Sequence, residues 1–147
     1  SVGQIPLYYA HKNTGRPLKE GKWFEKFRSN YLDVDNDALY PFGYGLSYTT
    51  FRFSDITLNR SSIGMDNELV ASVTVTNTGD RAGSEVVQLY IRDLVGSVTR
   101  PVKELKGFEK VTLEAGEQTE VVILATGSVN EYEIRIGSSS RDIRLTM

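Results

Sequence analysis

From Phe51 onward, apolar and polar residues alternate with a period of two, which is the pattern of β-strands with one buried face. In residues 69–76, for example, every second position from Leu69 holds an aliphatic side chain that faces the core. Turn-forming residues separate the alternating runs, as in Asn77-Thr78-Gly79-Asp80 and Glu114-Ala115-Gly116-Glu117. The pattern predicts about seven strands, near residues 51–59, 68–77, 84–93, 103–113, 117–125, 131–137 and 142–147.

Short antiparallel strands with frequent turns are typical of an all-β sandwich of the immunoglobulin or fibronectin III-like type. One segment departs from strand phase, because Leu105, Phe108 and Val111 are spaced three apart. A β-bulge near Gly107 would let Leu105 and Phe108 point to the same side. We therefore expect an antiparallel sandwich with one bulged strand.

The first third of the chain has a different character. It holds most of the 15 aromatic residues and three of the 4 prolines, and prolines or glycines interrupt it every few positions. No long helix or strand fits this pattern, although residues 22–28 could form a short helical turn. The sequence thus divides into an extended, aromatic-rich arm or linker over residues 1–50 and a sandwich domain over residues 51–147.

Residues 40–51 are too rich in aromatic rings and glycines for a solvated linker. Because large aromatic residues are mostly buried, we expect these rings to pack the arm onto the sandwich: Tyr40, Phe42, Tyr44 and Tyr48. An alternative is that exposed Trp23, Tyr31 or Tyr40 stack on sugar rings, since a flat π face suits the apolar face of a pyranose.

Composition excludes several classes of protein. No apolar run approaches the roughly 20 residues of a membrane-spanning helix, and a net charge of −2 argues against a nucleic-acid binder. The chain has 0 cysteines, which excludes disulfides, cysteine-based zinc sites and thiol nucleophiles. No initiator Met and no signal peptide are visible, so we expect a piece of a longer protein.

His11 is the 1 histidine of the chain, which excludes any multi-histidine metal site. It lies in a polar segment, His11-Lys12-Asn13-Thr14-Gly15-Arg16-Pro17. The favoured interpretation is a surface or turn-stabilising histidine. The alternative is a loop that touches a neighbouring domain or a ligand.

Acidic residues offer two further candidate sites. Asp33, Asp35 and Asp37 resemble the start of a calcium loop, but Ala38 and Tyr44 stand where the loop requires glycine and glutamate. Turn and capping roles are therefore favoured, and we expect no metal and no cofactor. Other carboxylates alternate with apolar residues and read as solvated strand faces rather than as a catalytic acid–base pair: Glu85, Glu120, Glu131 and Glu133.

The segment Ala38–Phe51, with the sequence Ala-Leu-Tyr-Pro-Phe-Gly-Tyr-Gly-Leu-Ser-Tyr-Thr-Thr-Phe, resembles a signature of glycoside hydrolase family 3. In those β-glucosidases and β-xylosidases it lies where the catalytic part joins a C-terminal fibronectin type III-like domain. Further matches follow in order along the chain: Gly3-Gln4-Ile5-Pro6 with Tyr8-Tyr9, Asn13-Thr14-Gly15-Arg16-Pro17, Val75-Thr76-Asn77-Thr78-Gly79, Gly83, Val86-Val87-Gln88-Leu89-Tyr90, Arg100-Pro101 and Leu105-Lys106-Gly107-Phe108.

The resemblance implies that residues 1–50 include the end of the preceding α/β-sandwich domain. It also implies that the parent enzyme works by a retaining double displacement, with an Asp nucleophile and a Glu acid/base in its upstream domains. Neither has a matching position here, so the chain is expected to hold no catalytic residue and to be inactive alone. Bacterial periplasmic β-glucosidases resemble it most, which implies a periplasmic or secreted protein.

The resemblance favours a non-catalytic structural module whose partners are the upstream catalytic domains of the same parent chain. Two alternatives stay open. The first is a carbohydrate-binding module for polymeric β-glucan or xylan, with His11, Asn13, Arg16 and Trp23 as candidate substrate contacts. The second is an oligomerisation module that joins two copies into a homodimer.

Two segments depart from the family pattern. Residues 1–9 resemble a strand of the parent's α/β sheet, and without that sheet we expect them to dock on the sandwich, pair with another copy or stay exposed. The connection over residues 125–131 is shorter than is usual in the family, which implies either a shortened loop or residues that are missing from the numbering.

Overall fold

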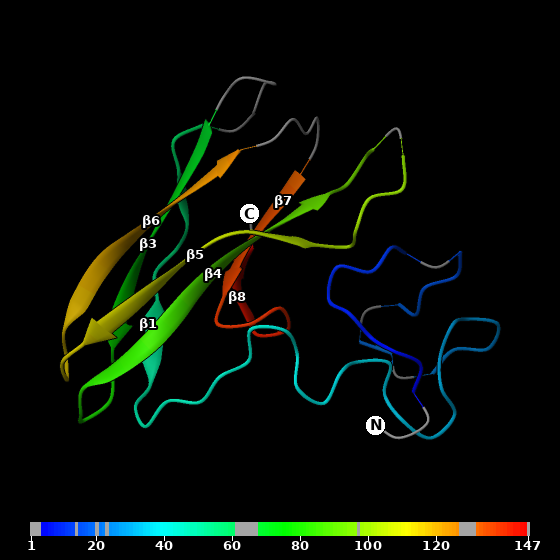
Figure 1. Ribbon diagram of the computed structural model, residues 1–147, viewed down its shortest axis with the longest axis horizontal. Helices are drawn as coiled ribbons and strands as arrows, with labels where there is room; N and C mark the ends of the chain where they lie inside the picture. Colours follow the sequence, from blue (N-terminus) through cyan, green and yellow to red (C-terminus); the bar gives the residue numbers. More distant parts are fainter. Residues whose placement is uncertain are drawn as a thin grey trace.

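The computed structural model describes residues 4–13, 15–19, 21–22, 24–60, 68–96, 98–126 and 132–146. A sandwich of two β-sheets occupies one side of the molecule, and the arm, residues 4–50, folds beside it and then runs along one end of the sheets (Figure 1). The described residues of the arm contain no helix and no extended strand, only isolated bridges such as Pro17 with Ser29.

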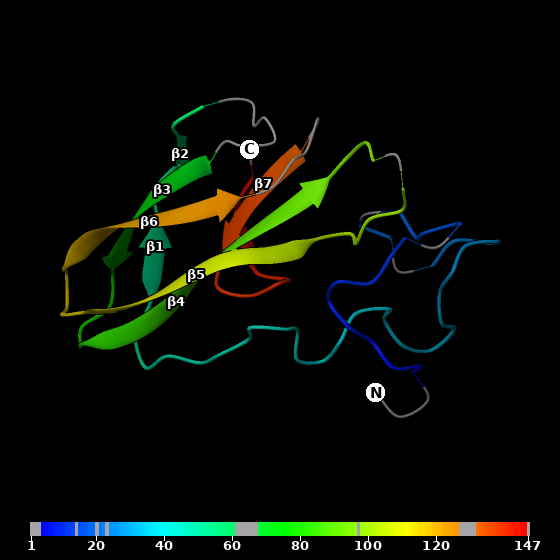
Figure 2. The ribbon, with the colours of Figure 1, turned by 45° about the horizontal axis from the view of Figure 1, so that its top comes forward.

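Both sheets are antiparallel throughout, and the two layers are seen side by side in Figure 2. In the first sheet β3 pairs with the other three strands: β1 (Phe51–Phe53), β2 (Thr57–Leu58), β3 (Glu68–Asn77) and β6 (Gln118–Thr126). The second sheet has the order β5-β4-β7-β8: β4 (Gly83–Asp93), β5 (Glu104–Leu113), β7 (Tyr132–Gly137) and β8 (Ile143–Thr146). The predicted all-β sandwich is confirmed.

Strands β3 to β8 match six of the predicted segments to within one residue at either end. The remaining prediction, a single strand over residues 51–59, is wrong in detail, because the segment is divided into β1 and β2. Between β1 and β2, two hydrogen bonds join Ser54 to Thr74 in place of the regular ladder. The Ser54 amide donates to the Thr74 carbonyl, and the Thr74 amide donates to the Ser54 hydroxyl. Ile56 then turns into the core.

The core lies between the sheets and is built from the inward positions of the alternating runs. Burial of each such aliphatic side chain stabilises the fold by about 1.5–3 kcal/mol. The core residues are Ile56, Leu69, Ala71, Val73, Val75, Val87, Leu89, Ile91, Leu113, Val121, Ile123, Ala125, Ile134 and Ile136.

The predicted bulge is confirmed. Leu89 and Tyr90, which are consecutive in β4, face Gly107 and Leu105 in β5, so Lys106 is the extra residue. Leu105 therefore lies opposite Tyr90 on the outer face of the second sheet, and Gly107 faces the interior, where a Cβ atom would collide with a side chain of β6.

The helical turn considered for residues 22–28 does not form in the described part of that segment. A single turn closes where the amide of Arg28 donates to the carbonyl of Glu25 at 3.3 Å. Phe27 has a φ of 65°, and this left-handed backbone cannot continue a right-handed helix. Across all described residues, no helix is long and apolar enough to cross a membrane.

Candidate functional site: the contact between arm and sandwich

The outer face of β4 is buried where strand alternation would expose it. Leu89 and Ile91 point into the core, so Gln88 and Tyr90 point outward, yet these two residues are only 3% and 0% exposed. The arm covers them, since Tyr9 lies against Tyr90 and the Gly43 carbonyl accepts a hydrogen bond from Gln88.

Two aromatic residues from distant parts of the arm meet over Tyr90. Tyr9 stacks on Phe42 with ring centroids 4.1 Å apart, and its edge faces Tyr90 at 6.0 Å. The amide of Leu105 donates to the Tyr9 hydroxyl at 3.4 Å. Such ring pairs stabilise by about 0.5–1.5 kcal/mol beyond the area they bury, so this cluster fastens both ends of the arm to β4.

A polar network completes the contact. The Gln88 side-chain amide donates to the carbonyls of Gly43 and Ser138 at 3.1 and 2.7 Å, and its oxygen accepts a bond from the Tyr90 hydroxyl at 2.6 Å. Burial raises the pKa of Tyr90, so the phenol stays protonated and remains a donor. The buried glutamine is thus satisfied by the arm on one side and by the β7–β8 turn on the other.

Gly43 is required at this contact for two reasons. Its φ is 76°, in the left-handed region, and a Cβ atom there would overlap the side-chain amide of Gln88. The same turn is closed by a bond from the Tyr44 amide to the carbonyl of Pro41, and the Phe42 carbonyl accepts a bond from the Ser140 amide. A tight turn therefore forms at Gly43.

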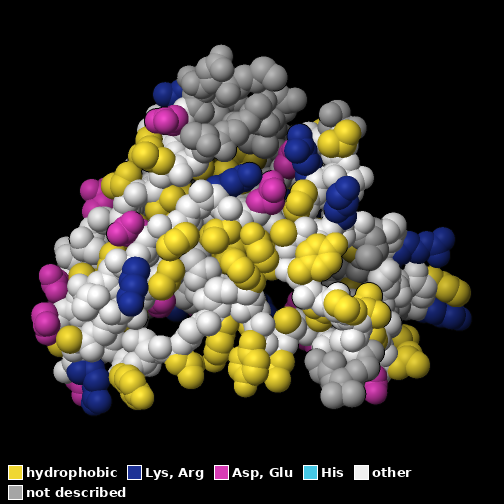
Figure 3. Space-filling model, viewed as in Figure 1, with side chains coloured by type: hydrophobic (Ala, Val, Ile, Leu, Met, Phe, Trp, Pro, Cys, Tyr) yellow, Lys and Arg dark blue, Asp and Glu magenta, His cyan; other side chains and the backbone are white. Residues whose placement is uncertain are grey.

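The opposite side of the arm is exposed and apolar. We define the exposed arm surface as Leu39, Tyr40, Phe42, Tyr44, Leu46 and Tyr48, with exposed fractions of 75%, 72%, 48%, 48%, 88% and 93%. Figure 3 shows hydrophobic side chains gathered along the edge of the molecule where the arm runs. The expectation that Tyr40, Phe42, Tyr44 and Tyr48 bury is therefore wrong, because a single chain segment lying on a sheet can bury only its inner side.

Asn77 holds the arm at the point where it enters β1. Its Nδ2 group donates to the carbonyls of Arg81 and Leu113 at 2.8 and 3.0 Å, and its Oδ1 atom accepts bonds from the Thr49 hydroxyl and the Gly79 amide at 2.7 and 3.0 Å. The turn signature Asn77-Thr78-Gly79-Asp80 does not predict this role. The signal was its position, since it continues the inward series of β3 and a buried amide must be hydrogen-bonded.

Arg144 fixes the next residues of the chain. Its guanidinium donates to the Phe51 carbonyl at 2.9 Å and lies 4.7 Å from the centre of the Phe53 ring. It also lies 3.0 Å from Asp142 and 3.9 Å from Glu85. One guanidinium thus joins β8, β4 and the start of the sandwich.

The pKa values of the two carboxylates beside Arg144, Glu85 and Asp142, are shifted in opposite directions. Burial raises the pKa of Glu85, whereas a hydrogen bond from the Ser138 hydroxyl lowers the pKa of Asp142, with Arg144 adding to that effect. Glu85 is half-buried, as is Glu133 in β7.

The expectation of solvated strand faces is therefore wrong for these two glutamates. It is confirmed for Glu120, which is exposed, and Glu131 lies outside the described residues.

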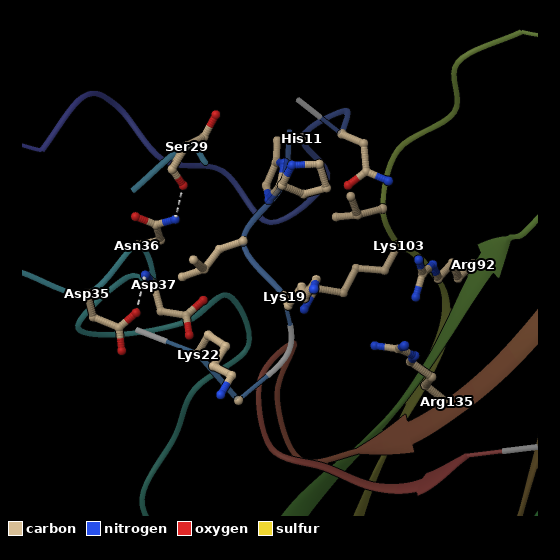
Figure 4. Close-up of a pocket in the computed structure, with 15 residues that line it drawn as sticks. His11, Lys19, Lys22, Ser29, Asp35, Asn36, Asp37, Arg92, Lys103 and Arg135 are labelled. Atoms are coloured by element: carbon tan, nitrogen blue, oxygen red, sulfur yellow. Dashed lines mark hydrogen bonds between the residues drawn. The ribbon is translucent and has the colours of Figure 1, made fainter. Parts of the chain in front are cut away.

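The four candidate substrate contacts do not all lie at one site. His11 and Asn13 are exposed and line a polar cavity of about 530 Å³ between arm and sandwich (Figure 4). Its lining also includes Asp37, Arg92, Lys103 and Arg135. Within the described part of the chain, Arg16 is not among the residues that line this cavity, and Trp23 lies outside the described residues.

The His11 segment is also tied to the sandwich through its backbone. The His11 carbonyl accepts a bond from the Val102 amide at 2.9 Å, and Lys12 pairs with Pro101. Its ring Nδ1 atom lies 3.0 Å from the Lys12 carbonyl.

The aspartates of the candidate calcium loop form a turn and an ion pair. The amide of Asp37 donates to the Asp35 side chain at 3.2 Å, and both carboxylates face Arg141 at 3.3 and 3.7 Å. Asp33 is exposed. Among the residues that the structure describes, no group of three His, Cys, Asp or Glu side chains could hold a metal ion.

The first described residues combine two of the outcomes expected for residues 1–9. Tyr9 docks on the sandwich, whereas Ile5 and Tyr8 are 70% and 65% exposed. The Ile5 amide donates to the Tyr31 hydroxyl at 2.8 Å, so this segment is held within the arm. The short connection over residues 125–131 falls largely outside the described residues.

Comparison with known proteins defines the family. A fibronectin type III-like domain matches residues 85–128. A periplasmic β-glucosidase of Salmonella typhimurium is 56% identical over 82% of this chain, and a putative β-xylosidase of Formosa agariphila is 41% identical over 99% of it. The chain belongs to the family 3 glycoside hydrolases and contains their fibronectin type III-like domain.

The fold of this family 3 chain is also seen in a solved enzyme. The crystal structure of a β-glucosidase from Listeria innocua in complex with glucose covers 99% of the chain with 40% identity and a TM-score of 0.88. The chain spans only 16% and 20% of the Salmonella and Formosa proteins and 22% of the Listeria chain. The resemblance found in the sequence is confirmed.

Proposed function

We propose that this chain is the C-terminal, non-catalytic structural module of a β-glycosidase, and that the parent hydrolyses terminal β-glucosides or β-xylosides. The names of its relatives, β-glucosidase and β-xylosidase, support the activity of the parent. The small share of those relatives that the chain spans supports the role of a module. The name of the Salmonella relative favours a periplasmic or secreted location.

The exposed arm surface is the observation that carries the proposal. Large contiguous apolar surfaces on soluble proteins mark interaction sites. Here six large apolar side chains within residues 39–48 are 48% to 93% exposed, while the inner side of the arm is fastened to β4. The proposed occupant is the preceding catalytic part of the same parent chain. About four fifths of each relative lies outside this segment, and the arm precedes the sandwich, so it is the part that adjoins the catalytic portion.

The carboxylates of the sandwich support a non-catalytic role. A retaining glycosidase needs two carboxyl groups about 5 Å apart, facing each other across the substrate. Glu85 and Asp142 instead converge on the Arg144 guanidinium, and Glu133 is paired with Arg92 and Arg135. We expect no turnover of aryl β-glucosides by the pure 147-residue chain; measurable turnover would overturn this part of the proposal.

A pair of matched leucines tests the docking role. Leu46 in the arm is 88% exposed and Leu124 in β6 is 56% exposed, so serine at either position should leave the thermal midpoint of the isolated chain almost unchanged. In the parent enzyme, Leu46→Ser should lower the midpoint by several degrees, since it removes a buried contact, and Leu124→Ser should not.

Two results would refute the docking role. One is an equal midpoint for both variants of the parent enzyme. The other is light scattering in which Leu46→Ser converts a dimer of the isolated chain into a monomer, because the surface would then join two copies.

A further inference from the structure

Three cations gather on the outer face of the second sheet, next to the part that the arm covers. Arg92 lies at the end of β4, Arg135 in the middle of β7, and Lys103 just before β5. In Figure 4 all three lie on the sandwich side of the polar cavity. The strand pairing explains this, since Arg135 faces Tyr90 and Arg92 faces Glu133 across the β4–β7 ladder.

Within 4.0 Å, these three cations share one carboxylate among the described residues. Glu133 serves both arginines, at 3.7 Å from Arg92 and 2.8 Å from Arg135. Lys103 donates to the Ser140 carbonyl and has no carboxylate within 4.0 Å in the described part of the chain. Burial lowers the pKa of Lys103 and Arg135 adds to that effect, while Asp37 on the arm partly offsets it.

The guanidinium of Arg135 is also incompletely satisfied. Its Nε atom is buried and has no hydrogen-bond partner among the described residues. Buried donors of this kind are rare and each destabilises by about 1–3 kcal/mol. The side chain as a whole is 22% exposed and lines the cavity, so its terminal N–H groups are the part that an oxyanion there can reach.

The arm side of the cavity carries charges of both signs, since Lys19 and Lys22 line it together with two aspartates. It presents the carboxylates of Asp35 and Asp37 together with Asn36 (Figure 4). Asn36 is fixed in place, since it donates to the Ser29 carbonyl at 2.7 Å and accepts from the Tyr31 amide at 3.3 Å. Carboxylates accept hydrogen bonds from hydroxyl groups but repel a second anionic group.

We propose that the polar cavity binds the hexuronate unit of an acidic saccharide. The sugar carboxylate lies against Arg92, Lys103 and Arg135. The ring hydroxyls donate to the exposed carboxylates of Asp35 and Asp37, which keep their ion pair with Arg141. A volume of about 530 Å³ accommodates one or two sugar units and lies in the usual range of small-ligand sites. The inference concerns binding by this chain itself and does not depend on the exposed arm surface.

Titration of the 147-residue chain with sodium glucuronate, followed by ¹H–¹⁵N NMR at constant ionic strength, tests the site. We expect saturable shifts at the amides of Arg92, Lys103 and Arg135. Glucose has the ring without the carboxylate and acetate has the carboxylate without the ring, so each should bind at least about tenfold more weakly. Equal binding of acetate would reveal a simple anion site, equal binding of glucose a neutral sugar site, and either result overturns the proposal.

Matched lysine variants locate the site. Lys103→Met removes the charge and keeps most of the length of the side chain, and Lys110→Met makes the same change at an exposed position of β5 outside the cavity. The Kd for glucuronate should rise about tenfold in Lys103→Met and stay unchanged in Lys110→Met.

Arg92→Met provides a second test at the more exposed edge of the cation wall, in case Lys103→Met does not fold, and the same rise in Kd is expected. Unchanged affinity in a folded variant at Lys103 or Arg92 would overturn the proposal.

Discussion

The sandwich and the arm differ in how they bury their apolar side chains. Residues of the sandwich core such as Leu89 and Ile134 are fully buried between two sheets that the chain itself supplies. The arm has one inner side, fastened through Tyr9, Phe42 and Gly43, and an outer side on which Tyr48 is 93% exposed. The core between the sheets is therefore buried by the sandwich itself, whereas the outer side of the arm is left uncovered.

A pair of leucines shows this contrast most strongly. Leu89→Ala removes a side chain with 0% exposure and should lower the free energy of unfolding by about 2–5 kcal/mol. Leu46→Ala in the arm, at 88% exposure, should change it by less than about 0.5 kcal/mol. Urea unfolding of both variants measures the difference, and equal losses would mean that the arm contributes its own core.

Asn77 tests whether the arm is fastened by polar contacts. Asn77→Leu has nearly the same shape but leaves the Leu113 and Arg81 carbonyls and the Thr49 hydroxyl without their partner, so we expect a loss of about 2–3 kcal/mol. The control is Gln118→Leu, at an exposed position of β6, which should stay within about 0.5 kcal/mol. Urea unfolding gives both values, and a neutral result for Asn77→Leu would contradict its anchoring role.

The burial of Phe42 is intermediate between that of the sandwich core and that of the outer side of the arm, since its ring stacks on Tyr9 and is still 48% exposed. Phe42→Ala should therefore destabilise by about 1–2 kcal/mol, less than the truncation of a fully buried ring. Tyr40→Ala, at 72% exposure, serves as the control and should have almost no effect. A loss as large as that of Leu89→Ala would show that the ring belongs to the sandwich core.

The pH dependence of stability separates the two carboxylates beside Arg144. Because burial raises the folded pKa of Glu85 above its ordinary 4.5, its ionised form disfavours folding near neutral pH, and this penalty disappears as pH falls through the raised pKa. Because the folded pKa of Asp142 is lowered from 3.8, its ionised form stabilises the fold above that value, and this contribution is lost as pH falls through the lowered pKa.

Urea unfolding across the acidic range measures these effects. Glu85→Gln should remove the gain in stability between neutral pH and the ordinary pKa of glutamate, and Asp142→Asn should reduce the loss at lower pH. Identical pH profiles for wild type and Glu85→Gln would contradict the burial of that carboxylate.

The strands could be predicted from the sequence because alternation is a local signal. The bulge at Lys106 was predictable for the same reason, since three apolar residues around Gly107 fell out of strand phase. The burial of Gln88 and Tyr90 could not be predicted, because it depends on Tyr9 and Phe42, which lie far away in the sequence. The alternation of β4 assigns both residues to an outer face and says nothing of what covers it.

The candidate site was predicted only in part. His11 and Asn13 do line the polar cavity, but its cationic wall was missed, because Arg92 and Arg135 sit at positions that read as solvated. The burial of Tyr40 and Tyr48 was predicted wrongly, since aromatic residues are mostly buried and the proposed partner that would bury these two lies outside the chain.

Hydroxyl-radical footprinting tests most directly whether the exposed arm surface is covered in the parent enzyme. The account predicts that Tyr40 and Tyr48 are oxidised rapidly in the isolated chain and protected in the parent, with Tyr90 protected in both as the internal reference. Equal oxidation of Tyr40 and Tyr48 in the isolated chain and in the parent would contradict it.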